Sequence, residues 1–567
     1  MSIGPMGFAF PAGLGEAFEG ELAAWEAADG TERLWNRDAS LWTGGDEANW
    51  LAWLDVTERQ LSDPARFPRF AAEVKARGFE DIVLLGMGGS SLCPEVLSFT
   101  FGRRAGFPRL SILDSTDPEQ VLALDRRLDI SKTLFFVSSK SGSTLEPNVF
   151  FAYFFDRARQ ELGDAAGSHF IAITDPGSKM EKAAKENGFW KTFYGEPKIG
   201  GRFSALSDFG MVPLAAMGVD VADFLLRARS MAKECRLPAS QNPGVRLGVA
   251  LAAAWKLGRD KLTVIAEKGI FDLGAWMEQL VAESTGKHGK AIIPVDREPL
   301  IAPERYGTDR IFVYIALDGE TAFADDVAAI EAAGHPVIRI TLRERMDLGQ
   351  EFFRWEIATA AAGALMGINP FDQPDVEASK IETRKLTDEF EQTGELPAET
   401  ARLTNGGISL FCDDANAAAL GLDETTPLSE ALRRHLGRIS AGDYFALLAY
   451  INMNAASEAG LQQIREAVLS RNGNATCLGF GPRFLHSTGQ AYKGGANNGV
   501  FVQITCDDAE DVAVPGQKYS FGVVKAAQAR GDLDVLFERG RRAVRLHIAG
   551  NVGEALERIG KIASGAE

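Results

Sequence analysis

The chain has 567 residues, of which 46% are hydrophobic and 24% charged, which are the proportions of a globular protein. At roughly 100–200 residues per domain, this length predicts about two to four domains. The formal net charge of −18 excludes general nucleic-acid binding, which needs a basic face, so an anionic substrate would require a local pocket of Lys and Arg.

Cysteine, histidine and apolar patterns exclude further classes of protein. The five cysteines are widely spaced and form no C-x-x-C pair, which excludes a disulfide framework and a cysteine zinc site. The six histidines form no H-E-x-x-H pattern, and we predict neither a metal nor a cofactor. The first 20 residues lack a signal-peptide pattern, and no apolar stretch reaches the roughly 18 residues of a membrane span. The predicted compartment is therefore the cytoplasm.

Strands and helices alternate along most of the chain. Residues 1–65, rich in Trp, Glu and Ala, predict short helices, and from residue 70 onward short apolar strands alternate with helical patterns. This alternation predicts an α/β protein with doubly wound parallel sheets, in which ligands bind at the carboxyl ends of the strands. The predicted regions are an N-terminal helical segment (1–65), a first domain (66–240), a second domain (241–387), a linker-like stretch (388–440) and a C-terminal α/β module (441–567) that opens with a helix.

The first chemistry-bearing motif, Gly86-Met87-Gly88-Gly89-Ser90-Ser91, directly follows a predicted strand over 81–85. Glycines at this place let the backbone approach a ligand closely, and either serine can cap the next helix. The motif lacks the G-x-G-x-x-G spacing of a dinucleotide site and the G-K-[ST] of a P-loop. Alone, it is also the motif of an ordinary tight turn.

The second motif follows the predicted strand 133–137 and precedes a helix predicted over 148–158. It offers five hydroxyls, one ammonium and the free backbone N–H groups of a helix start, which suit a phosphate. Helix capping favours the same residue types, so this turn alone leaves both interpretations open. Two such turns in one sheet favour a small phosphorylated ligand. The hydroxyls and the ammonium belong to Ser138, Ser139, Lys140, Ser141, Ser143 and Thr144.

A candidate general base lies in the helix predicted over 272–287. Gln279, Glu283 and Lys287 recur at i, i+4 and i+8 and share one face of that helix. A solvated polar face has the same pattern. The functional interpretation is that Glu283 projects into a cleft and abstracts a proton next to a carbonyl, which requires only a suitably placed carboxylate.

Three further segments carry candidate polar residues. Gly200-Gly201-Arg202-Phe203-Ser204 opens a loop, and Gln373 and Lys380 border a stiff, proline-held turn and the helix after it. His486 lies among Gly, Ser, Thr and Gln after a predicted strand, where it could transfer protons. Most helix lysines are solvated and most lone histidines are structural, so both alternatives stay open for Lys380 and His486.

Together these segments resemble the glucose-6-phosphate isomerase family, which is built on two sugar-isomerase (SIS) domains. More narrowly, the chain is similar to the isomerase half of bifunctional transaldolase/glucose-6-phosphate isomerase chains. The matching motifs span most of residues 80–490 and are GMGGSSL, SSKSGSTLEPN, GGRFSALSDFG, Q-x-x-x-E-S-x-G-K, NPFDQPDVEASK and HSTGQ.

The resemblance implies an aldose–ketose isomerase of glycolysis and gluconeogenesis that acts on a sugar phosphate without cofactor or metal. It implies that Glu283 moves a proton between C1 and C2 and that Arg202 stabilises the enediolate. Lys380 and His486 would assist ring opening. The residues implied to hold the sugar phosphate or line the site are Gly89, Ser90, Ser139, Lys140, Ser141, Thr144, Gln279 and Gln373.

One departure concerns the histidine. In the family this histidine precedes the F-D-Q-P turn and typically comes from the partner subunit of a dimer, whereas His486 follows Lys380 by about a hundred residues. We therefore expect the C-terminal module to return it to the site, within one chain or across a homodimer, with His288 and His335 as fallback candidates. The alternatives in function are a non-catalytic SIS-type sugar-phosphate regulator and an isomerase that also accepts mannose 6-phosphate. A fused or separate transaldolase is a further partner that the resemblance allows.

Overall fold

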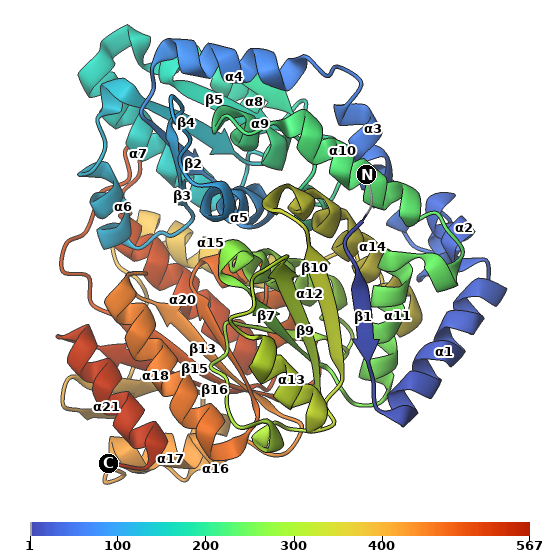
Figure 1. Cartoon of the computed structure of the whole chain (residues 1–567). Coiled ribbons are helices and arrows are strands. Elements are labelled where there is room, and N and C mark those ends of the chain that lie inside the picture. Colours follow the sequence, from blue (N-terminus) through green and yellow to red (C-terminus); the bar gives the residue numbers. More distant parts are fainter. Residues whose placement is uncertain (1–2) are drawn as a thin grey trace. The chain divides into compact units, whose positions relative to one another are not determined.

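The computed structural model describes residues 3–567 (Figure 1). These residues form three sheets in which parallel strand pairs predominate, which confirms the predicted α/β class. The chain divides into two compact units. Among the described residues, unit 1 comprises 3–114, 127–285 and 311–372, and unit 2 comprises 115–126, 286–310 and 373–567. The domain boundaries expected from the sequence stay predictions.

The first sheet of unit 1 has the strand order β3-β2-β4-β5-β6, with parallel neighbours throughout. Its central strands are continuous apolar runs, as is usual where helices cover both faces. Because β3 lies on one side of β2 and β4 on the other, a topological switch point falls between β2 and β4. The strands are β2 (Asp81–Leu85), β3 (Arg109–Leu113), β4 (Thr133–Ser138), β5 (Phe170–Thr174) and β6 (Lys191–Tyr194).

The second sheet contributes four strands to unit 1, in the order β1-β10-β9-β7. The N-terminal strand β1 pairs antiparallel with β10, and β10 is parallel to β9. The sequence predicts only helices for residues 1–65, so β1 is a correction; a four-residue strand is stable only through its partner, which local pattern does not show. The strands are β1 (Met6–Ala9), β7 (Lys261–Ala266), β9 (Arg310–Leu317) and β10 (Val337–Leu342).

The helices of unit 1 begin and end at residues typical of helix termini. Asn242 caps α11 by accepting a hydrogen bond from the Val245 N–H, and Pro243 occupies the first helical position. Gly78 ends α4 in the left-handed conformation. The helices are α1 (Ala12–Ala27), α2 (Gly30–Trp35), α3 (Val56–Gln60), α4 (Arg66–Arg77), α5 (Leu92–Phe101), α7 (Leu145–Leu162), α8 (Lys179–Glu186), α9 (Asp208–Ala216), α10 (Val221–Glu234), α11 (Pro243–Lys256), α12 (Leu273–Thr285), α13 (Ala324–Ala332) and α14 (Leu348–Met366).

Unit 2 is built around the third sheet, with the strand order β11-β12-β16-β15-β13-β14. Strands β13 to β16 run parallel to one another, and β11 and β12 add an antiparallel edge in which β12 pairs with β16. Its elements are α6 (Pro118–Asp125), β8 (Ile293–Asp296), α15 (Pro374–Thr393), β11 (Leu403–Asn405), β12 (Ile408–Phe411), α16 (Asp414–Leu420), α17 (Leu428–Leu436), β13 (Tyr444–Tyr450), α18 (Ala455–Asn472), β14 (Ala475–Phe480), α19 (Gly489–Gly494), β15 (Gly499–Cys506), α20 (Phe521–Glu538), β16 (Arg542–Ile548) and α21 (Val552–Ser564).

Two predictions for this part of the chain are wrong. The region from 441 onward opens with the buried strand β13 rather than a helix; seven apolar residues in a row fit either element, and pairing with β14 and β15 decides between them. Residues 388–440 are not an irregular linker, because they hold the end of α15 and the elements β11, β12, α16 and α17. Leu410, Leu420 and Leu432 from this stretch belong to the apolar core of unit 2.

Within residues 3–567, none of the helices is both long and apolar enough to cross a membrane.

Candidate functional site

The two predicted phosphate turns meet at the switch point of the first sheet. Residues 86–91 follow β2 and residues 139–144 follow β4, and these strands are direct neighbours with Leu85 opposite Val137. The Ser138 hydroxyl donates to the Ser90 carbonyl at 3.2 Å, which ties one turn to the other. The fold therefore places the turns that carry Gly89, Ser90, Ser139, Lys140, Ser141 and Thr144 side by side, and their role as one phosphate site stays a prediction.

The second turn presents donors that the protein itself does not use. The Ser139 hydroxyl is buried, yet it has no hydrogen-bond partner in the described part of the chain. Thr144 occupies the N-cap position of α7, but its side chain makes no capping bond. A buried hydroxyl without a partner is costly, and a helix start without a cap leaves positive backbone donors open. Both features suit an anionic group.

Lys140 is engaged differently from its neighbours. Its ammonium forms an ion pair with Asp175 and donates to the Pro197 carbonyl at 3.2 Å. Burial raises the pKa of the Asp175 carboxyl, while the hydrogen bond and charge of Lys140 oppose that rise. The Lys140 side chain is thus part of a network with the loop after β5 and with the segment after β6.

A close backbone contact joins the first turn to the Arg202 loop. A Cβ added to Gly89 would lie 2.0 Å from the Gly201 carbonyl oxygen and 3.0 Å from the Arg202 nitrogen. Only glycine allows this approach. The Gly89 position therefore sets where the short 3-10 helix Gly201–Phe203 begins, and with it the position of Arg202.

Arg202 is held rigidly in the interior of unit 1. Only 2% of its surface is exposed. Its Nε donates to the Ser284 hydroxyl at 2.7 Å, and its Nη2 donates to the carbonyls of Pro370 and Asp372 at 2.5 and 2.8 Å. These bonds fix the plane of the guanidinium, which a flexible lysine could not reproduce.

Glu283 lies against this guanidinium. Its Oε1 is 3.2 Å from Arg202 Nη1, and its Oε2 accepts a hydrogen bond from Gln279 Nε2 at 3.1 Å. Gln279 and Glu283 are one turn apart on α12 and both are buried, so the predicted polar face of this helix is not a solvated face. The structure thus brings together Glu283, Arg202 and Gln279.

Burial sets the electrostatics of this pair. It lowers the pKa of the Arg202 guanidinium from its ordinary value, and the charges of Glu283 and Asp372 partly offset that effect. A buried ion pair costs desolvation energy, and replacing it with apolar residues is often neutral or stabilising. A pair of this kind is therefore weak evidence of a stabilising role and stronger evidence of a chemical one.

The remaining predicted site residues belong to unit 2. Gln373 is the N-cap residue of α15, and Lys380, within that helix, forms an ion pair with Glu377 at 2.7 Å. His486 ends a short 3-10 helix that follows β14. Of the fallback histidines, His288 is exposed, and His335 precedes β10, at the amino end of that strand rather than the carboxyl end.

Gln490 is a polar residue of the HSTGQ motif that we did not single out from the sequence. Its Oε1 accepts from the backbone N–H groups of Asp375 and Val376 at 2.9 and 3.1 Å, and its Nε2 donates to the Gly286 carbonyl at 2.8 Å. It links α19 to the start of α15 and to the residue that directly follows α12 in the chain. Its place in the HSTGQ motif could have marked Gln490 as a candidate. Its hydrogen-bond partners could not be predicted, because they lie far away in the sequence.

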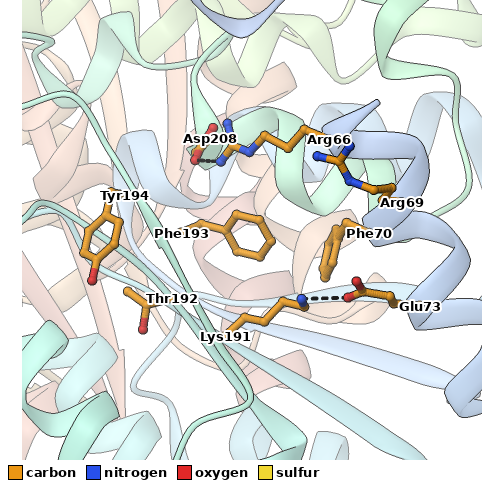
Figure 2. Close-up of a pocket in the computed structure, with 9 residues that line it drawn as sticks. All are labelled: Arg66, Arg69, Phe70, Glu73, Lys191, Thr192, Phe193, Tyr194 and Asp208. Carbon is orange, nitrogen blue, oxygen red and sulfur yellow. Dashed lines mark hydrogen bonds and ion pairs between the residues drawn. The ribbon is translucent and has the colours of Figure 1, made fainter. Parts of the chain in front are cut away.

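A hollow of unit 1 lies at the outer edge of the first sheet, between α4 and β6 (Figure 2). There the side chain of Arg66 pairs with Asp208, and Lys191 pairs with Glu73 at 2.7 Å. Its cations are neutralised by neighbouring carboxylates, so it is a weaker candidate for an anionic ligand than the turns at the switch point.

In residues 3–567, no group of three or more His, Cys, Asp and Glu side chains is arranged to hold a metal ion.

Comparison with known proteins identifies the family. A phosphoglucose isomerase family model matches residues 71–296. A glucose-6-phosphate isomerase of Thermus thermophilus is 30% identical over 387 residues, which cover 60% of this chain and 91% of that relative. The chain belongs to the phosphoglucose isomerase family. The matched range contains both predicted phosphate turns, Arg202, Gln279 and Glu283.

Other members and structures agree with this assignment. The glucose-6-phosphate isomerase of Methanocaldococcus jannaschii is 29% identical over 342 residues, 53% of this chain and 83% of its own length. The crystal structure of a hypothetical protein from Thermus thermophilus has a TM-score of 0.57 and 26% identity, over 67% of this chain and 99% of that one. A glucose-6-phosphate isomerase from Chlamydia trachomatis, at 22% identity and a TM-score of 0.55 over 66% of this chain and 87% of its own, supports the fold.

Proposed function

We propose that this member of the family interconverts glucose 6-phosphate and fructose 6-phosphate, with Glu283 as the general base. The observation that carries the proposal is the buried contact between Glu283 and the immobilised guanidinium of Arg202. Family relatives named glucose-6-phosphate isomerase support the substrate. A regulator that only binds a sugar phosphate would need the two turns and not this costly pair.

The proposed reaction uses these groups in turn. In the open-chain aldose, the Glu283 carboxylate removes the proton from C2, and the electrons of that C–H bond move to the carbonyl oxygen on C1 to give an enediolate. The C2 hydroxyl gives its proton to the C1 oxygen and becomes the carbonyl, and return of the proton from Glu283 to C1 gives the ketose. Arg202 stabilises the negative oxygen without moving, because its contacts with Ser284 and two carbonyls are already made. Gln279 orients Glu283.

The proposed phosphate site uses hydroxyls and backbone rather than a lysine ammonium. Ser139 and Thr144 have hydroxyls that the turn itself does not consume, and the N-terminus of α7 lies beside them. The Lys140 ammonium is neutralised by Asp175, so we propose that Lys140 acts chiefly through its backbone N–H. Gly89, Ser90 and Ser141 would complete this site, with Gln373 lining it.

Ring opening is assigned to His486 and Lys380 on the resemblance alone. We expect His486→Ala to lower the rate with ring-closed substrate. Unchanged turnover would show that another group opens the ring.

The cellular setting is also proposed. All five cysteines are free thiols, which agrees with a reducing cytoplasm. A homodimer and a transaldolase, fused or separate, remain proposals about partners. Analytical ultracentrifugation of the full chain would test the first, and a transaldolase assay of the same preparation would test whether this chain supplies that activity.

The decisive experiment measures conversion of fructose 6-phosphate to glucose 6-phosphate, coupled to an NADP-dependent dehydrogenase, in EDTA. Glu283→Gln should lower turnover by about a thousandfold, the scale of general-base catalysis, and should still bind the sugar phosphate. The matched control is Glu278→Gln, which removes the same charge from the same helix and should leave turnover unchanged. No turnover in folded wild-type protein that binds the sugar phosphate would favour a regulator.

A further inference from the structure

The sheet of unit 2 has a switch point of its own. From β13 the chain passes to β14 on one side and then returns to β15 on the other. In open α/β sheets ligands bind outside the carboxyl ends of the strands at such a reversal. Here those ends are Tyr450 on β13, and Thr505 and Cys506 on β15.

A cavity of about 310 Å³ lies at this place, large enough for a small metabolite. Its walls are the ends of these two strands, the first turns of α20, and the carboxyl half of β16. Residues 396–399, which belong to no helix or strand, cover part of it. We call this stretch the covering segment.

Two arginines in the cavity wall hold one carboxylate of the covering segment. Arg545 Nη2 is 2.8 Å from Glu399 Oε2, and Arg530 Nε is 3.7 Å from Glu399 Oε1. Arg530 also donates to the Pro397 carbonyl. Glu399 thus occupies the position between two guanidiniums that an oxyanion ligand would take. The charges of both arginines also act on the nearby Asp534 carboxyl, whose pKa burial raises and the two arginines lower.

The hold on Glu399 is incomplete at Arg545. This residue is 5% exposed, it packs over the Phe411 ring at 4.4 Å from the ring centre, and its Nε has no hydrogen-bond partner in residues 3–567. An arginine fork normally gives Nε and Nη to the same oxyanion. Leaving a buried guanidinium N–H unpaired costs free energy that a second oxygen would recover.

The third cation of the wall is already neutralised. Lys525 is buried between Asp117, at 2.9 Å, and Asp508. Lys525 therefore has a structural role in the wall. Arg530 and Arg545 remain as the cations that could bind a ligand in place of Glu399.

We propose that this cavity is a second ligand site, outside the catalytic centre, for a small molecule with a terminal oxyanion group. Binding would place that group, a phosphate or a carboxylate, on Arg530 and Arg545 and would displace Glu399, which acts as a tethered internal competitor. The proposal does not depend on which reaction unit 1 catalyses.

The proposed ligand site is tested by hydrogen–deuterium exchange of the full chain, which reports on each segment separately. Inorganic phosphate and malonate serve as probes at constant ionic strength. In the wild type each effective probe should speed exchange in residues 396–400, because the covering segment is released, and slow it in residues 542–548. In Glu399→Gln the probe concentration for half-maximal protection of 542–548 should fall about tenfold, because the tethered competitor is removed. The matched control Glu557→Gln, an exposed carboxylate on α21, should behave as the wild type.

The arginine variants make the test decisive. Arg545→Gln should abolish the response, and Arg545→Lys, which keeps the charge and loses the fork, should weaken it; circular dichroism checks that both fold. A response to phosphate alone or to malonate alone identifies the oxyanion. No response to either probe in the wild type and Glu399→Gln, or an undiminished response in Arg545→Gln, would overturn the proposal.

Discussion

The sheet β3-β2-β4-β5-β6 of unit 1 and the sheet of unit 2 place a switch point at the carboxyl ends of their strands, but the chemistry there differs. In unit 1 the turn after β4 leaves the Ser139 hydroxyl without a partner among the described residues. In unit 2 the charged groups at the corresponding edge are paired with one another, Lys525 with Asp117 and Arg545 with Glu399.

This difference separates two ways of preparing a site. Unpaired donors at a strand end are ready for a ligand and need no rearrangement when it arrives. Paired charges must first exchange a protein partner for a ligand, so the ligand competes with the fold itself. The topology decides where a site can lie, and the state of its donors decides how readily it binds.

Among the substitutions that follow, the one at Arg202 should lower turnover the most. Arg202→Lys keeps the charge but cannot reach Ser284 and two carbonyls together, so turnover should fall by about 100- to 1,000-fold, as when a fixed oxyanion donor is lost. Coupled steady-state kinetics measures this. Arg229→Lys, at a partly exposed position of the same unit, is the control. Turnover within tenfold of wild type would remove Arg202 from the proposed chemistry.

A smaller effect is expected from moving the Arg202 loop without touching the side chain. Gly89→Ala should force the Gly201 carbonyl away and lower turnover by about ten- to a hundredfold through misplacement. Gly200→Ala, directly before Gly201 and with no atom outside its chain neighbours within 4 Å of the added Cβ, should change turnover little. Equal effects of the two substitutions in the same assay would show that the close approach at Gly89 does not position Arg202.

Two serines of the turn after β4 test whether an unpaired hydroxyl contributes more to substrate binding than a paired one. Ser139→Ala should raise KM for fructose 6-phosphate by about tenfold, because a buried hydroxyl available to a charged group is lost. Ser141→Ala should have a weaker effect, since that hydroxyl is exposed and already bonded to Ser143 at 2.8 Å. If Ser141→Ala raised KM more than Ser139→Ala, the exposed Ser141 hydroxyl and not the buried Ser139 hydroxyl would be the main phosphate contact.

The smallest effect is expected at the edge of the unit 2 sheet. Glu399→Gln and Arg545→Gln should leave kcat and KM of the isomerase within about twofold of wild type in the absence of added oxyanions, the size of change usual for substitutions outside a site. Steady-state assays in a buffer without phosphate or carboxylate check this. A large loss of turnover would mean that the cavity at the unit 2 sheet affects catalysis directly. The two sheet edges would then not serve separate functions.

Local patterns predict much of the first sheet and the candidate site. The strands predicted over 81–85 and 170–174 have the observed bounds, because buried parallel strands are short apolar runs ended by Gly, Ser or Asp turns. The spacing of Glu283 and Gln279 alone predicts that they share one helix face. What spacing could not show is that this face is buried, which depends on Arg202 arriving from another segment.

The errors have one physical origin. Strand β1 and strand β13 are set by their neighbours in a sheet, and the polar stretch 388–440 folds because it covers an apolar core formed by later strands. Sequence separation hides such partners. The pairing of the Lys140 ammonium escaped prediction for the same reason, since Asp175 lies 35 residues further along the chain.

The sequence by itself determined the class of fold, the turns at the strand ends, the residue types of the site and the resemblance to an isomerase family, because each depends on neighbours in the chain. Tertiary structure alone decided which of those groups are free. The same serines, arginines and carboxylates can be solvated, paired or left without a partner, and only the packing of distant segments determines whether a donor stabilises the fold or stays open to a ligand.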